Sequence, residues 1–113
     1  MSDRGTPRVT VYRVVDTAEL AALRATGNYG SNPNRSGKYF ALTLRGARAF
    51  AGAAMNAGSI ISTTTLPLSV VELGVRFDDP GRHGAGLSVF FSELQLPIVY
   101  GTMTPPSIVL EEL

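Results

Sequence analysis

The apolar residues of this chain repeat in two different periods, and this change of period limits the fold more than any other feature. In residues 17–26 and 44–57 they recur every three to four positions, which is typical of helices that bury one face. From residue 59 onward they mostly alternate with polar residues, which is typical of strands. The order predicts an α+β domain whose N-terminal half contributes two helices, packed on a mixed or antiparallel sheet.

Local signals set the expected ends of these elements. Asp16 and Glu19 form a D-x-x-E capping box at the start of the first helix, and Gly27 ends it. Residues 87–94 fit either a strand or a helical turn. Strands are otherwise predicted at residues 8–15, 38–42, 59–66, 69–77, 97–102 and 107–110. The turn-forming residues of segment 27–37 predict an exposed, mobile loop.

Length and composition exclude several classes of protein. A chain of 113 residues predicts one domain spanning residues 1–113, with residues 1–7 as a flexible tail. It contains no Cys and one His, His83, so thiolate zinc sites, multi-histidine metal sites and cysteine nucleophiles are excluded, and we expect no metal. Ten basic against nine acidic residues argue against nucleic acid as a partner. We expect neither a transmembrane segment nor a signal peptide.

Arg13 is the most unusual residue of the first predicted strand. Alternation places it on the same face as Val9, Val11 and Val15. A guanidinium on an apolar face is costly unless the face opens into a cleft or supplies an anionic partner. Arg13 is therefore a candidate binding residue.

Several short motifs occur in a characteristic order. They are Y-R-V-V at 12–15, a loop rich in Gly and Asn, G-K-Y-F-A-L-T at 37–43 and I-S-T-T at 61–64. Over residues 9–66 this arrangement resembles the ADP-ribosyltransferase superfamily, and in particular the small domains at the toxic ends of bacterial polymorphic toxins. The resemblance implies an ADP-ribosyltransferase-like fold that binds NAD and either cleaves its nicotinamide bond or transfers ADP-ribose.

The resemblance also implies roles for individual residues. Arg13 would hold the phosphate or ribose of NAD, and Tyr39 would stack on the nicotinamide. Three consecutive strand residues would shape the site: Ser62, Thr63 and Thr64. The family also uses a glutamate on a later strand, where this chain reads G-A-G-L-S-V-F-F, so Glu93 is the best remaining acid.

The same resemblance bears on partners and location. The small-molecule partner would be NAD, used as a substrate, or another nucleotide. A protein acceptor of ADP-ribose or a cognate immunity protein would be the macromolecular partner. We expect the domain to be cytoplasmic or to be secreted as part of a larger toxin.

Two other functions fit the residues. One is a metal-independent ribonuclease toxin, in which His83 is the acid or base and Arg13 or Arg82 holds the phosphate. The other is a non-catalytic module whose pocket binds a ligand or a partner protein. Nicotinamide release from NAD distinguishes the enzyme from the module.

Overall fold

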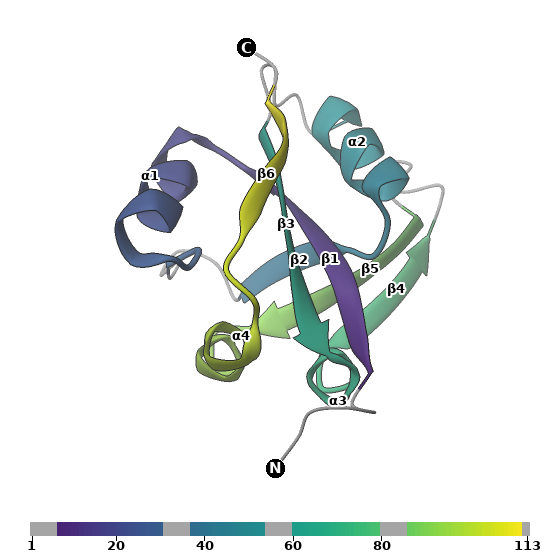
Figure 1. Cartoon of the computed structure of the whole chain (residues 1–113). Helices are drawn as coiled ribbons and strands as arrows, with labels where there is room; N and C mark the ends of the chain where they lie inside the picture. Colours follow the sequence, from purple (N-terminus) through teal and green to yellow (C-terminus); the bar gives the residue numbers. More distant parts are fainter. Residues whose placement is uncertain (1–6, 31–36, 54–59, 80–85, 112–113) are drawn as a thin grey trace.

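The structure is a computed structural model that describes residues 7–30, 37–53, 60–79 and 86–111. These residues form an α+β domain with one six-stranded sheet and four helices (Figure 1). The strands are β1 (Arg8–Val15), β2 (Gly37–Ala41), β3 (Ile60–Pro67), β4 (Val75–Asp79), β5 (Gly86–Ser92) and β6 (Ser107–Glu111). The helices are α1 (Thr17–Thr26), α2 (Leu44–Ala53), α3 (Leu68–Val71) and α4 (Leu96–Thr102).

The N-terminal elements confirm the sequence prediction. Asp16 caps α1 by accepting a 2.8 Å hydrogen bond from the backbone N–H of Glu19. Gly27 ends the helix with a φ of 82°, a left-handed conformation that glycine adopts readily. The predicted end of α2 and residues 31–36 of the loop predicted at 27–37 lie outside the described residues. The prediction that this loop is exposed is wrong at Tyr29 and Gly37, which are buried. Pro7, predicted to belong to the flexible tail, accepts a 2.9 Å hydrogen bond from Leu68 N–H.

Two strand predictions in the C-terminal half are wrong. The segment predicted as a strand at 97–102 is helix α4, because Pro97 fits the first turn of a helix and Leu96 and Val99 bury the same helical face. The strand predicted at 69–77 divides into the short helix α3, which buries Val70 and Val71, and strand β4. The ambiguous segment 87–94 is mostly strand β5.

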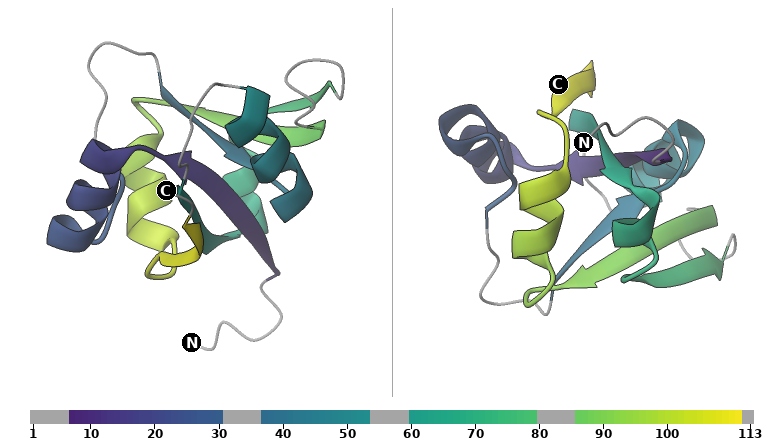
Figure 2. Two further views of the ribbon diagram at one scale, coloured as in Figure 1. Left: turned by 90° about the horizontal axis from the view of Figure 1, so that it is seen from above. Right: turned by 60° about the horizontal axis from the view of Figure 1, so that its bottom comes forward.

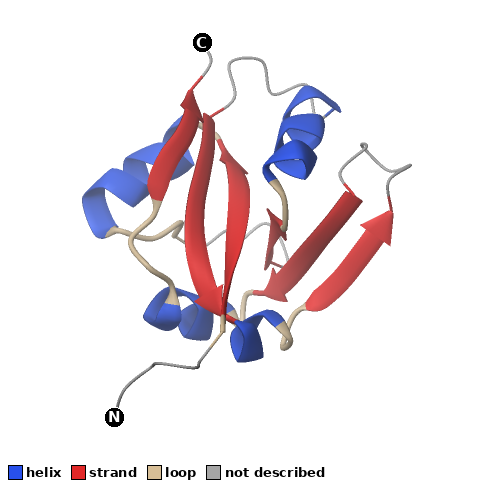
Figure 3. Cartoon of the chain, turned by 45° about the vertical axis from the view of Figure 1, so that its right-hand side comes forward, coloured by secondary structure: helices blue, strands red, loops and turns tan. Residues whose placement is uncertain are grey.

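All neighbouring strands of the sheet are antiparallel, in the order β4-β5-β2-β1-β3-β6. β1 pairs with β3 along its whole length, from Arg8 opposite Pro67 to Val15 opposite Ile60. Between β1 and β2, which are both fully described, the register contains one pair, Tyr12 opposite Ala41. The sheet therefore consists of two three-stranded halves joined at one point, and Figure 3 shows their strands running in different directions.

The core lies on one face of both halves. Val11 and Val15 of β1 and Phe40 of β2 are buried there, together with side chains from α1, α3 and α4. Helix α2 packs against β1, β2 and β5. Its Ala47 and the β3 residue Ile61 are buried outside this cluster, so α2 covers the other face (Figure 2). The divergence of β1 from β2 leaves room on the core face for polar side chains.

Candidate functional site

Arg13 lies on the core face of β1, where that strand begins to diverge from β2. Its side chain is 15% exposed, and its guanidinium donates from Nε and Nη2 to the two carboxylate oxygens of Glu19 at 2.5 and 3.0 Å. From Nη1 it also donates to the Tyr39 carbonyl of β2 at 2.8 Å. The predicted need for an anionic partner is met by Glu19. Arg13 also connects the two strands beside their single register pair.

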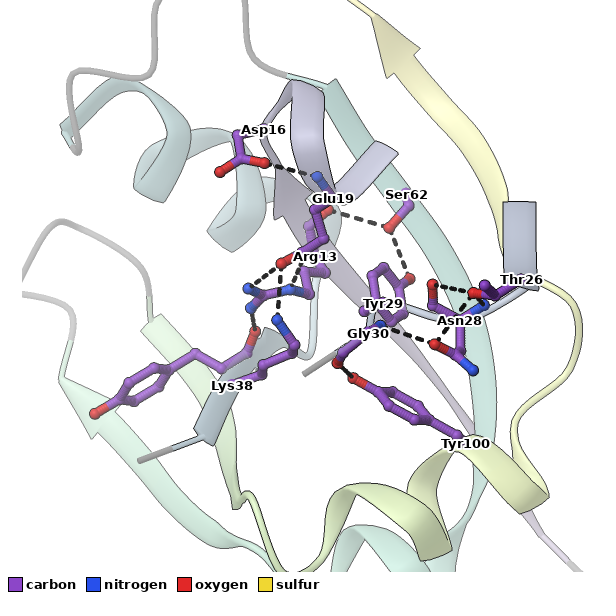
Figure 4. Close-up of polar contacts among 11 residues, drawn as sticks. Arg13, Asp16, Glu19, Thr26, Asn28, Tyr29, Gly30, Lys38, Ser62 and Tyr100 are labelled. Atoms are coloured by element: carbon purple, nitrogen blue, oxygen red, sulfur yellow. Dashed lines mark hydrogen bonds and ion pairs between the residues drawn. The ribbon is translucent and has the colours of Figure 1, made fainter. Parts of the chain in front are cut away.

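Lys38 of β2 completes a charged cluster with Arg13 and Glu19 (Figure 4). Its Nζ donates to Glu19 Oε2 at 2.9 Å, and the residue is 2% exposed. Three cationic N–H groups thus converge on one carboxylate, which is itself 11% exposed. Buried charges persist in proteins only when they are paired and hydrogen-bonded in this way.

Sequence reasoning did not select Glu19 or Lys38 as functional residues. Glu19 was interpreted only as part of the capping box, although Arg13 on an apolar face already required an acid nearby. Lys38 precedes Phe40 by two residues, so alternation along β2 places it on the core face. Lys38 could have been found from the alternation along β2, whereas the pairing of Glu19 with Arg13 depends on how α1 packs on the sheet.

Aromatic rings surround the cluster. The Arg13 guanidinium carbon lies 6.0 Å from the ring centre of Tyr29 and 5.8 Å from that of Phe40, within the range of cation–π attraction. The Tyr29 hydroxyl and Ser62 Oγ are 2.7 Å apart, and Ser62 Oγ donates to the Arg13 carbonyl at 3.2 Å. Burial raises the pKa of Tyr29 to about 12, although the Ser62 hydrogen bond and the Arg13 charge oppose this rise. The phenol is therefore neutral at physiological pH.

The cluster borders a cavity of about 240 Å³. Its lining comes from α1 and its N-cap, from the segment that follows α1, and from β2. It consists of Asp16, Ala18, Glu19, Ala22, Tyr29, Gly30 and Lys38. Arg13 does not itself line the cavity. It contacts Glu19, which does. On the side of Gly30, Tyr100 of α4 donates a hydrogen bond of 2.5 Å to the Gly30 carbonyl. Burial also raises the pKa of Tyr100.

The structure brings together only some of the predicted site residues. Ser62 lies opposite Arg13 in the β1–β3 register and shares its face. The hydroxyl of Thr63 donates to the Val11 carbonyl, and that of Thr64 donates to the Thr104 carbonyl. Both are hydrogen-bonded within the sheet region and are absent from the lining of the cavity.

The Tyr39 ring lies on the face of β2 opposite Lys38 and Phe40. It is 49% exposed, and its centre is 4.7 Å from that of the Phe90 ring. The hydrogen bond from Arg13 goes to the backbone carbonyl of Tyr39. Among the described residues, the aromatic side chain that lines the cavity is Tyr29, which sequence reasoning passed over as part of a loop.

The two remaining candidates are Glu93 and His83. Glu93 follows β5 and is not among the residues that line the cavity. His83 lies outside the described residues. Within the described part of the chain, no group of three or more metal-ligating side chains could hold a metal ion. No helix there is long and apolar enough to cross a membrane.

Comparisons of the chain with protein families, curated proteins and solved structures found no match.

Proposed function

We propose that the domain is an ADP-ribosyltransferase-like toxin domain that binds NAD and cleaves its nicotinamide bond or transfers ADP-ribose. The observation that carries the proposal is the position of Arg13, held over two aromatic rings at the divergence of β1 and β2. Ser62 lies beside it, as the order of motifs requires. A permanently charged fork next to a cavity suits the pyrophosphate of a dinucleotide.

The chemistry needs few groups. The bond between ribose C1′ and the nicotinamide ring nitrogen breaks, and its electron pair stays on that nitrogen. Water or an acceptor nucleophile adds to C1′ and loses a proton. A carboxylate would stabilise the positive charge that develops on the ribose, and Glu93 is proposed for this role. Tyr29 lines the cavity but is 2% exposed, so its ring offers the nicotinamide no open face.

Incubation with NAD and measurement of released nicotinamide test the proposal. We expect release by the parent protein and at least a tenfold loss, about 1.4 kcal/mol of activation free energy, in Glu93→Gln. His83→Ala is the matched control and should release nicotinamide at the parent rate.

The other outcomes would identify the rival functions. RNA cleavage that His83→Ala abolishes and Glu93→Gln retains would indicate the ribonuclease. Nucleotide binding without cleavage of either substrate would indicate a non-catalytic module. The absence of an acid from G-A-G-L-S-V-F-F, where the family has its glutamate, favours this last alternative.

A further inference from the structure

We infer that Arg13 and Lys38 form an anion site for a phosphate group, and that Glu19 occupies this site until a phosphate-bearing ligand displaces it. The inference deepens the proposed function, and it rests on that function in taking the pyrophosphate of NAD as the incoming group. It adds Lys38 as a binding residue and gives Glu19 the role of an internal competitor.

The geometry of the cluster is that of an oxyanion site. Nε and Nη2 of Arg13 each donate to a different oxygen of the Glu19 carboxylate, which is the two-point contact that guanidinium groups also make with phosphate. The Lys38 ammonium donates to one of those same oxygens at 2.9 Å. Lys38 is 2% exposed and lines the cavity, so its charge is directed at a site rather than at bulk solvent.

The charges of the cluster define the group that could replace Glu19. Arg13 and Lys38 carry two positive charges, and the Glu19 carboxylate balances one of them. A phosphate or pyrophosphate group with two negative charges would balance both. A monocarboxylate would bring no more charge than Glu19 already does and would lack its advantage of being attached to the site. The site should therefore discriminate between phosphates and simple carboxylates.

Glu19 can leave the site without unfolding α1. Its backbone N–H is held by the Asp16 side chain, independently of the carboxylate. Its side chain already lines the cavity of about 240 Å³, so there is space beside its present position. A displaced Glu19 carboxylate would enter a cavity that Asp16 also lines. Repulsion between these two carboxylates disfavours the displaced state, so Glu19 is an effective competitor.

Calorimetric titration with inorganic pyrophosphate tests the inference. Glu19→Gln removes the competing charge, so we expect it to bind pyrophosphate at least tenfold more tightly than the parent protein. Glu72→Gln is the matched control: it removes one negative charge from an exposed residue outside the cavity lining, and its affinity should change less than about threefold. Acetate should not bind to the parent protein, because it brings no more charge than the Glu19 carboxylate that already occupies the site. Circular dichroism verifies that each variant is folded.

A second measurement avoids substitution of the cluster. In the parent protein, added pyrophosphate should shift the NMR resonance of the Arg13 Nε–H group, because that group exchanges a carboxylate for a phosphate oxygen. Unchanged or weaker pyrophosphate binding in folded Glu19→Gln, or an unshifted Arg13 resonance at saturating pyrophosphate, would overturn the inference. Pyrophosphate binding without nicotinamide release would refute NAD cleavage alone. Nicotinamide release without tighter pyrophosphate binding in Glu19→Gln would refute the anion site alone.

Discussion

Replacing Ser62 with alanine tests whether the hydroxyl pair behind the cluster is sealed from water. Ser62 has one hydroxyl hydrogen and donates it to the Arg13 carbonyl, so the Tyr29 hydroxyl must be the donor in the 2.7 Å contact between them. Ser62→Ala leaves the Tyr29 hydroxyl without an acceptor, and Tyr29 is only 2% exposed. An unsatisfied buried donor costs about 1 to 3 kcal/mol.

Tyr29→Phe should cost less, because Ser62 keeps its bond to the Arg13 carbonyl. We expect a loss of about 1 kcal/mol in the free energy of unfolding for Tyr29→Phe, and about 2 kcal/mol for Ser62→Ala. In the double variant no hydroxyl is left unpaired, so the double variant should be about as stable as Ser62→Ala or more stable. The two substitutions would then couple by about 1 kcal/mol or more.

Urea unfolding of the parent, both single variants and the double variant gives these values, provided that the dependence on urea concentration is the same for all four proteins. Additive losses within about 0.5 kcal/mol would refute the reasoning. A loss below about 0.5 kcal/mol for Ser62→Ala would show that water from the cavity reaches the Tyr29 hydroxyl and replaces Ser62 as its partner.

Two further predictions concern pH and backbone packing. Because an unfolded tyrosine ionises near pH 10 and Tyr29 does so only near 12, the folded state retains a proton that the unfolded state loses. The free energy of unfolding of the parent should therefore fall as the pH rises from 10 to 12. In Tyr29→Phe it should fall by about 2 kcal/mol less over the same range. In Gly37→Ala the new Cβ would lie 1.9 Å from the Phe91 carbonyl oxygen, so β2 must move away from β5, and thermal melting should show a loss of about 3 kcal/mol. Gly101→Ala, which meets no atom within 4 Å, should instead raise the melting temperature slightly; equal effects of the two substitutions would contradict the packing argument.

The sequence predicted best those features that depend on neighbours along the chain. The cap at Asp16, the stop at Gly27 and the strand containing Arg13 are local signals, and all three are confirmed. The need of Arg13 for an anionic partner followed from its valine-rich face. The identity of that partner did not, because it depends on the angle at which α1 returns over the sheet.

The errors arose where an apolar run fits two structures. Pro97 to Thr102 was predicted as a strand, yet the deciding factor is that Leu96 and Val99 both reach the core from one helical face. Tyr29 was overlooked because a loop rich in Gly and Asn gives no sign of a buried ring. Its burial comes from packing against Phe40 of β2 and Tyr100 of α4, which the loop's own composition does not reveal.

Most paired strands of the sheet are far apart in the sequence, and this separation limits the speed of folding. β1 pairs with β3 although α1, β2 and α2 lie between them in the sequence, and this pairing brings Arg8 opposite Pro67. β2 pairs with β5 although four elements lie between them in the sequence. Among the pairs of the described sheet, β4 with β5 joins strands that follow each other directly in the chain. Pairing between residues far apart in sequence requires loop closure before any contact is gained, and such domains fold in milliseconds to seconds rather than microseconds. The hairpin of β4 and β5 can form early, whereas the two halves of the sheet are complete only after β1 has paired with β3 and β2 with β5.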